Sequence, residues 1–189
     1  MGKDSSRIYR MGGVPLKSRR PFMVRSIVAT ARLRERDLLP QFRQVASHGK
    51  GNWRVIRTEV SPGWVGANPR GHLSVRGMRS LAEARRALAQ AARAVSGKRS
   101  IGLLGFRVDN IVATSEVGHY VDLAKLSASG CPHETDYEPE LFPALIMRFT
   151  GSRCIALVFG SGKFVITGAK SLAEIRETIS EVLRCVSQT

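Results

Sequence analysis

Residues 162–186, GKFVITGAKSLAEIRETISEVLRCV, carry the pattern that decides the fold, because a similar stretch occurs earlier in the chain. Residues 71–95, GHLSVRGMRSLAEARRALAQAARAV, agree with them at nine of twenty-five positions, at an offset of 91 residues. A second pair, SIVATARL from Ser26 and NIVATSEV from Asn110, shares Ile-Val-Ala-Thr at an offset of 84 residues. Two copies in the same order predict two similar half-domains, joined near residues 97–104.

Each copy ends on a segment with the pattern of an amphipathic helix. Ser80 with Glu83, and Ser171 with Glu174, form the capping-box pattern that satisfies first-turn amides. Apolar residues then recur at helical spacing, and they are Leu81, Ala84, Leu88, Ala91, Ala92 and Val95 in the first copy and Leu172, Ile175, Ile179, Val182, Leu183 and Val186 in the second. Because the first stripe is built largely of alanine, we expect that helix to lie closer to its sheet.

Two short strands, Cys154–Phe159 and Lys163–Thr167, precede the second helix, and Gly160-Ser161-Gly162 joins them by a turn able to adopt positive φ. Gly-Ser-Gly-Lys is similar to a phosphate-binding loop, but a strand follows it instead of a helix N-terminus, so a hairpin is predicted. Alternation gives this hairpin two apolar faces, one with Ala156, Val158, Phe164 and Ile166, the other with Leu157, Phe159, Val165 and Thr167.

A sheet with helices on one side needs only one apolar face, so the second requires a cover: more helices, another chain or a ligand. The sequence offers two further short helices, near residues 38–47 and 122–129. A strand at Phe142–Phe149 begins with a ring beside Pro143. Phe142 and Phe159 are then either an ordinary core pair or two rings at the rim of an apolar sheet, able to enter base steps from the minor groove of DNA.

The formal charge of +15 is concentrated in the first part of the chain. Lys and Arg outnumber Asp and Glu by seven to one in residues 1–25 and by fifteen to four in residues 26–100, whereas residues 101–189 hold eight against ten. Cationic side chains that neutralise phosphates release counterions, so this bias favours a nucleic-acid partner over a merely solubilising surface. Residues 1–25 show no sustained period and are predicted to be a flexible basic tail.

The three cysteines, Cys131, Cys154 and Cys185, are odd in number and lack CxxC spacing, which argues against a disulfide framework and a structural zinc site. Reduced thiols in cytosol or nucleus are expected. Cys131 and His133 are two possible ligands, too few for a site, so neither a metal nor another cofactor is expected. No apolar run approaches about 20 residues and no secretory signal is found, so no membrane partner is expected.

Residues Tyr137–Phe149, YEPELFPALIMRF, and Cys154–Ser171, CIALVFGSGKFVITGAKS, with DNIVATSEV from Asp109, resemble the C-terminal repeat of the TATA-box-binding protein family. The resemblance is dense over residues 106–186 and weaker over residues 26–95. It implies an α+β fold: a saddle of two pseudo-symmetric repeats, each a curved antiparallel sheet with helices on the convex face, whose concave face binds the minor groove of DNA. The expected parts are a tail at 1–25, a divergent first repeat at 26–100 and a well-matched second repeat at 101–189.

The resemblance also implies residue roles in the second repeat. Phe142 and Phe159 match intercalating phenylalanines, and Asn110 matches an asparagine that hydrogen-bonds minor-groove acceptors. Glu138, Glu140 and Leu141 match a loop that family members offer to transcription factor IIB or its relatives; on composition alone they are equally a solvated turn. The other matched positions for DNA are Pro143 beside the first ring, the apolar Val112, Leu157, Val165 and Thr167, and the basic Arg148, Lys163 and Lys170.

The first repeat departs from the family pattern. Ser26 stands where the asparagine would be, and the 91-residue offset puts Asn68 opposite Phe159. Ser74 and Arg76 likewise stand opposite the apolar Val165 and Thr167. The first-repeat candidates for DNA contact are Val28, Trp53 as the nearest inserting ring, with Trp64 as its competitor, and Arg76. Charge in place of inserting rings predicts weaker kinking, more sequence-independent binding and weak TATA selectivity.

Three functions are compatible with these patterns. The leading hypothesis is a nuclear, non-catalytic general transcription initiation factor that binds double-stranded promoter DNA and recruits a transcription factor IIB-like protein and other initiation-complex subunits. The alternatives are a platform of the same fold that no longer grips DNA, and an RNA-binding component of a large particle. An enzyme is disfavoured, because the sequence holds no Ser/His/Asp set, no paired carboxylates and no metal-ligand spacing.

Overall fold

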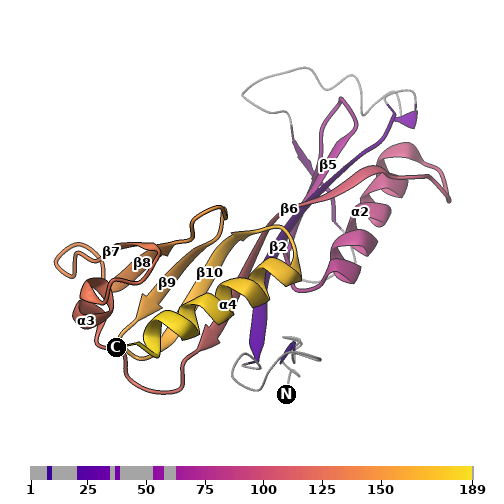
Figure 1. Ribbon diagram of the computed structural model, residues 1–189. Helices are drawn as coiled ribbons and strands as arrows, with labels where there is room; N and C mark the ends of the chain where they lie inside the picture. Colours follow the sequence, from indigo (N-terminus) through magenta and orange to yellow (C-terminus); the bar gives the residue numbers. More distant parts are fainter. Residues whose placement is uncertain (1–7, 10–20, 35–36, 39–52, 58–62, 189) are drawn as a thin grey trace, which may run out of the picture. The chain divides into compact units, whose positions relative to one another are not determined.

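The computed structural model describes residues 8–9, 21–34, 37–38, 53–57 and 63–188, and Figure 1 draws the rest as a grey trace. The chain divides into two compact units. Unit 1 comprises residues 1–25 and 110–189, and unit 2 comprises residues 26–109. The boundaries between them fall inside two long strands, β2 (Phe22–Arg32) and β6 (Leu104–Glu116). Within the described ranges, every helix is too short or too polar to cross a membrane.

Unit 1 is an antiparallel sheet in the order β6–β10–β9–β8–β7 with helices packed on it. Its strands after β6 are β7 (Glu134–Asp136), β8 (Ala144–Arg148), β9 (Ile155–Phe159) and β10 (Lys163–Ala169). Helix α3 (Leu123–Ala128) packs near β8, and helix α4 (Leu172–Val186) packs on β10. Figure 1 shows α4 running along one face of the sheet, so this unit has one helix-covered side.

Unit 2 repeats this plan, with shorter strands at its outer edge. Its antiparallel order is β3–β4–β5–β2. The elements are β3 (Arg54–Val55), β4 (Trp64–Ala67), β5 (His72–Met78) and helix α2 (Leu81–Ser96), which packs on β5 and β4. The two-residue strand β1 (Ile8–Tyr9) pairs with the start of β2 in unit 1. Sheets with helices on one face are the α+β class expected from the sequence.

The strand registers reproduce the internal repeat pair by pair. β10 and β9 place Thr167 opposite Ile155, and β5 and β4 place Arg76 opposite Trp64, each residue moved by the same offset. Thr114 opposite Val165 has its counterpart in Thr30 opposite Ser74, which preserves the second offset as well. Both offsets read from the sequence are therefore the structural ones.

A shared β-bulge extends the repeat to a backbone irregularity. The β10–β6 register shifts between Ile166 and Ala169, and the β5–β2 register shifts at the corresponding place. The bulged strands carry glycines with positive φ, Gly168 at 90° and Gly77 at 83°. Only glycine adopts this region readily, so the local chemistry of the bulge is duplicated too.

Both predicted helix caps form. The Ser80 hydroxyl accepts the Glu83 amide at 3.2 Å, and the Ser171 hydroxyl accepts the Glu174 amide at 3.1 Å. Each glutamate carboxylate then accepts the amide of the residue before the serine, Arg79 in one copy and Lys170 in the other. The carboxylate thus reaches one residue further back than in the usual capping box.

The two helices fill their cores differently. Side chains of Ile175, Ile179 and Val182 are completely buried under α4, whereas alanines dominate the buried face of α2. Helix α2 packs closely on both β5 and β4, whereas α4 packs on β10. The expected closer packing of the alanine-rich helix is confirmed.

Several expectations need correction or fall outside the described residues. Cys131 and Cys185 form a disulfide with Cα atoms 5.6 Å apart, and only Cys154 is a free, buried thiol, so the expectation of three reduced thiols is wrong. The fold joins two cysteines that are 54 residues apart in the sequence. Strand β2 begins at Phe22 rather than at Ser26, because Phe22 and Val24 are buried. The helix expected near 122–129 is α3, and that near 38–47 lies almost wholly outside the described residues.

Candidate nucleic-acid interface

The sheet of unit 1 has one buried and one half-exposed face. The face under α4 carries side chains with no exposed area, namely Ile111, Ala113, Ala156, Val158, Phe164 and Ile166. Side chains of the opposite face are half-buried, and they are Val112, Thr114, Leu157, Phe159, Val165 and Thr167. We call these six residues the open face. Among the described residues, α3 and α4 leave it accessible, so the strand alternation predicted from the sequence is confirmed.

Two aromatic rings stand at the rim of the open face. Phe142 precedes β8 and is 41% exposed, and Phe159 ends β9, opposite Ala144. The ring centroids are 6.5 Å apart in an edge-on arrangement with an interplanar angle of 63°. Pro143, next to the first ring, is exposed. The rings therefore do not form an interior pair, and they present apolar edges to a ligand.

Asn110 is held by the bulge of β10. Its side-chain oxygen accepts the Gly168 amide at 2.8 Å, and its nitrogen donates to the Thr167 hydroxyl at 3.4 Å. Because the oxygen is used by the backbone, the amide NH₂ group is directed to the side of Thr167 on the open face. Amide donors suit the N3 and O2 acceptors of the minor groove.

Three exposed basic residues lie at or next to the ends of strands in the sheet that carries the open face. Lys163 begins β10, and Lys170 lies between β10 and α4. Arg148 ends β8, where its guanidinium nitrogen is 3.9 Å from a carboxylate oxygen of Glu134. Exposed pairs at this distance contribute little, so this contact costs little to exchange for a phosphate.

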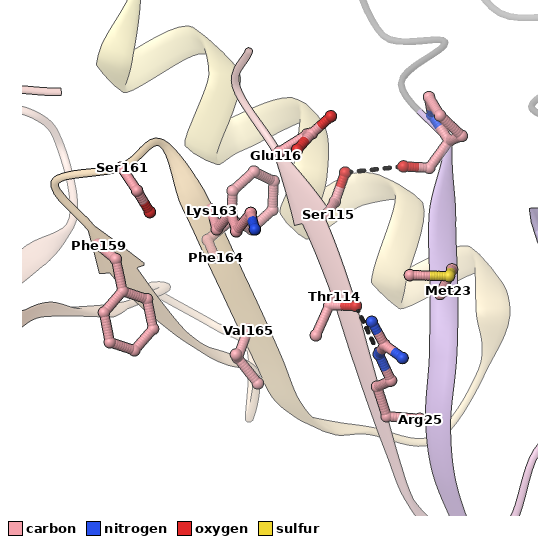
Figure 2. Close-up of a pocket in the computed structure, with 11 residues that line it drawn as sticks. Met23, Arg25, Thr114, Ser115, Glu116, Phe159, Ser161, Lys163, Phe164 and Val165 are labelled. Atoms are coloured by element: carbon pink, nitrogen blue, oxygen red, sulfur yellow. Dashed lines mark hydrogen bonds between the residues drawn. The ribbon is translucent and has the colours of Figure 1, made fainter. Parts of the chain in front are cut away.

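A hollow of about 620 Å³ extends the open face toward β2. Figure 2 shows Phe159 and Val165 on one side of it and Met23 and Arg25 on the other. The Arg25 Nε atom donates to the Thr114 hydroxyl at 2.9 Å. Thr114 and Arg25 were missed as candidates: alternation from Val112 identifies Thr114, whereas Arg25 was assigned to the tail.

The predicted partner loop is a turn at the sheet edge. Amides of Leu141 and Phe142 both donate to the Glu138 carbonyl at 2.9 Å, which closes the turn. Glu138 and Glu140 are exposed, and Leu141 is 79% exposed. An acidic turn with one bare leucine can offer both charge and an apolar anchor to another protein.

The corresponding positions in unit 2 are built differently. The indole of Trp64 lies over Gly66, where a Cβ atom would run into the ring, and the Arg76 guanidinium carbon is 5.0 Å from the Trp64 centroid. Gly66 corresponds to Leu157 of the open face. Trp64 therefore replaces a missing side chain on the sheet, and it does not take a rim position.

Among the described residues of unit 2, Trp53 is the exposed aromatic ring nearest to the sheet edge. Trp53 is 39% exposed and meets Trp64 edge-on, with centroids 5.8 Å apart. Asn68, at the position corresponding to Phe159, accepts the amides of Arg70 and His72 with its side-chain oxygen, both at 3.0 Å. Ser74 is buried, and Val28 is half-buried on β2. This tip is thus a polar turn that is closed by hydrogen bonds to the Asn68 side chain.

These features define a class of protein: an α+β chain that repeats one sheet-and-helix plan, and whose described residues leave an apolar sheet face accessible in the second copy. The solved structure of TBP from Methanococcus jannaschii has the same fold, with a TM-score of 0.73 over 89% of this chain and 99% of that one, at 22% identity. The expected fold class is therefore confirmed.

Sequence comparisons find a family model and relatives that match the second repeat. Residues 105–189 match the family model of Transcription factor TFIID (or TATA-binding protein, TBP). The TATA-box-binding protein of Archaeoglobus fulgidus is 38% identical over 57% of this chain and 62% of its own length. That of Thermococcus sibiricus is 42% identical over 43% of both chains. TATA-box-binding protein-like 1 of Entamoeba histolytica is 34% identical over 44% of this chain and 38% of its own. The matches thus span about two fifths to three fifths of these relatives.

Proposed function

We propose that this protein is a non-catalytic general transcription initiation factor that binds duplex DNA through the minor groove. The observation that carries the proposal is the open face of unit 1, with the rings of Phe142 and Phe159 at its rim. An apolar face of this kind requires a partner, and a flattened minor groove offers sugars and base edges of matching character. The match of residues 105–189 to the TATA-binding protein family model supports the same function.

In this proposal the residues divide into four roles. The two phenylalanines insert between base pairs, beside Pro143, and offset an unstacking cost of a few kcal/mol per step. The Asn110 amide donates to minor-groove acceptors, and the open-face residues contact sugars. Phosphate contacts come from Arg148, Lys163 and Lys170 in unit 1 and from Arg76 in unit 2, with Val28 and Trp53 completing the first repeat.

Sequence selectivity is proposed to be weak. Minor-groove acceptors distinguish A·T from T·A poorly, so such a site reads groove width and deformability. Unit 2 contributes a guanidinium over an indole and a polar turn in place of a second pair of inserting rings. Charge contacts add affinity on any sequence, which lowers the advantage of a TATA element.

The exposed turn with Glu138, Glu140 and Leu141 is proposed to bind a transcription factor IIB-like protein. Its support is the combination of two exposed carboxylates and a bare leucine on a hydrogen-bonded turn. Charge reversal at both glutamates is expected to abolish co-purification of that partner while DNA binding is unchanged. Loss of DNA binding together with the partner would contradict separate roles for the turn and the open face.

The location proposed is the nucleus, where a transcription factor of a nucleated cell meets its DNA. Relatives come from archaea as well as from Entamoeba histolytica, so the location depends on the cell of origin. Immunofluorescence of the full chain in its own cells tests this. A signal away from DNA would argue against the proposal.

DNA bending is the test of the main proposal. Energy transfer between dyes at the two ends of a short duplex should report a bend with the full chain, and Phe142→Ala combined with Phe159→Ala should remove most of it. Each lost ring should also weaken binding by about tenfold or more, because burial of a phenylalanine is worth about 1.5–3 kcal/mol.

Tyr120→Ala is the matched control, because Tyr120 is a 77% exposed ring of the same unit outside the open face. It should leave bending and affinity as in the parent chain. Equal bending by the double variant and the parent would refute insertion by these rings. Tight binding of structured RNA in preference to duplex DNA would instead support the particle-component alternative. A protein bound on the open face, with no salt-dependent DNA binding, would support the platform alternative.

A further inference from the structure

Three residues with metal-binding side chains meet at the C-terminal end of α4, away from the open face. Cys131 lies between α3 and β7, His133 directly precedes β7, and Cys185 is in the last turn of α4. One ligand atom from each lies within 4.8 Å of the other two. In the structure the two sulfurs are joined as a disulfide.

The imidazole of His133, beside this disulfide, lacks a hydrogen-bond partner at one ring nitrogen. The His133 side chain is 11% exposed, and its ring packs on Phe149 with centroids 4.7 Å apart. Its Nδ1 atom is buried without a hydrogen-bond partner, the only such side-chain nitrogen or oxygen among the described residues. A buried polar atom without a partner costs about 1–3 kcal/mol, so this nitrogen calls for an explanation.

Glu181 fixes which ring nitrogen is available. One oxygen of its carboxylate is 3.0 Å from His133 Nε2 and also accepts a hydrogen bond from the Arg184 guanidinium. An ionised carboxylate only accepts, so Nε2 carries the proton in this pair. In the neutral ring the lone pair is then on Nδ1, the nitrogen without a hydrogen-bond partner.

Two cysteine sulfurs and one histidine nitrogen form a donor set that suits zinc. With Zn–S near 2.3 Å and Zn–N near 2.0 Å, ligand atoms of a tetrahedral site stand roughly 3.5–3.8 Å apart. That spacing is within reach of the observed cluster once the sulfur–sulfur bond is open. A carboxylate on the far nitrogen of a ligating histidine is also the usual outer partner of such sites.

We propose that, when the Cys131–Cys185 disulfide is reduced, these two cysteines and His133 Nδ1 bind a zinc ion, with Glu181 orienting the ring. A dithiol or phosphine reductant supplies two electrons, the sulfur–sulfur bond breaks, and two protons complete the thiols. Zinc then displaces these two protons as the two Zn–S bonds form. Three protein ligands leave a fourth position for water or a partner's side chain. The site is independent of the function proposed for the open face.

Cobalt titration of the full chain tests the proposal. After reduction with a phosphine and removal of the reductant without air, the chain should bind one Co²⁺ with thiolate-to-metal charge-transfer absorption in the near ultraviolet. One equivalent of Zn²⁺ should bleach that absorption. The air-oxidised chain should show none of it. A reduced, folded chain without the absorption would overturn the proposal.

Variants assign the ligands. Cys131→Ser and Cys185→Ser should each lose the charge-transfer band or most of its intensity, and His133→Ala should weaken Co²⁺ binding by at least about tenfold. Glu181→Gln should weaken it by about 10–100-fold, the effect typical of outer partners. Circular dichroism of each reduced variant reports folding separately.

Two controls match the ligands in residue type. Cys154→Ala removes the buried free thiol, and His119→Ala removes an exposed imidazole of the same unit. Both should bind Co²⁺ as the parent does. An undiminished band in His133→Ala, or its loss in His119→Ala, would show that the metal is held elsewhere and would overturn the assignment.

Discussion

The two repeats share a backbone and differ in the surface built on it. Paired residues, bulge and helix caps coincide at the offsets read from the sequence, yet Leu157 stands on the open face of unit 1 whereas its counterpart Gly66 lies under the Trp64 indole. Backbone hydrogen bonding fixes the plan of a repeat, because every strand and cap must satisfy its amides. Side chains on a face that the fold does not bury are free to diverge.

The duplicated bulge offers the strongest test of this comparison. A Cβ atom on Gly168 would run into the Arg153 carbonyl, whereas on Gly77 it would meet only the Gly63 Cα at 3.4 Å. Gly168→Ala should lower the free energy of unfolding by about 3 kcal/mol or more, and Gly77→Ala by about 1–2 kcal/mol from positive φ alone. Urea unfolding followed by circular dichroism measures both. Gly102→Ala, with open space around it, should change little. Equal losses at the two bulges would show that close approach to Arg153 is unimportant.

Substitutions at the equivalent positions of α4 and α2 test whether the two helices pack at different distances from their sheets. Ile175→Ala in α4 should cost about 3 kcal/mol, because it leaves a cavity at a fully buried site. Its counterpart Ala84→Ile in α2 should also destabilise, by about 1–3 kcal/mol, because the closely packed helix has no room for three more carbons. Thermal and urea unfolding report both changes. A stabilised Ala84→Ile chain would mean that α2 has space beneath it.

A double-mutant cycle tests whether Trp64 stands in for the side chain that Gly66 lacks. Gly66→Leu alone should destabilise by about 2 kcal/mol, because the new side chain meets the indole. Added to Trp64→Ala, the same leucine should be tolerated, which gives a coupling free energy of about 1–2 kcal/mol. Additive losses in urea unfolding would mean that the ring and the glycine are independent.

The smallest expected effect is electrostatic. Arg76 occupies the position of Thr167, so Arg76→Gln should lower the salt dependence of DNA binding by up to about 0.9 log units per log unit of salt, the slope of one phosphate contact. Fluorescence anisotropy at several salt concentrations measures it. Arg86→Gln, on the exposed side of α2, is the matched control and should leave the slope unchanged. An unchanged slope in Arg76→Gln would remove this arginine from the interface.

Local chemistry made much of the fold predictable. The helices of both repeats, their serine caps, the hairpin closed at Gly162 and the alternation of β9 and β10 all depend on neighbours within a few residues. The repeat then supplied the register between strands, because two copies must pair alike. The family resemblance supplied the candidate roles of Phe142 and Phe159, and the structure adds their position at the rim.

Long-range contacts account for what the sequence did not reveal. Cys131 and Cys185 are brought together only when α4 packs against the unit, and nothing near either cysteine indicates the other. Arg25 lies on a strand whose start was hidden by the basic residues before it. The placement of Trp64 over Gly66 follows from the direction of one side chain, which strand periodicity does not determine.

The Asn68 turn makes the hairpin tip of unit 2 chemically unlike the hairpin tip of unit 1. The Asn68 side-chain oxygen accepts hydrogen bonds from two backbone amides, whereas the corresponding residue of unit 1 is Phe159. A DNA-binding protein with two identical halves would bind a duplex in either of two orientations with equal free energy. If both units contact DNA as proposed, the unlike tips make the two orientations of the protein on a promoter differ in energy before any second factor binds.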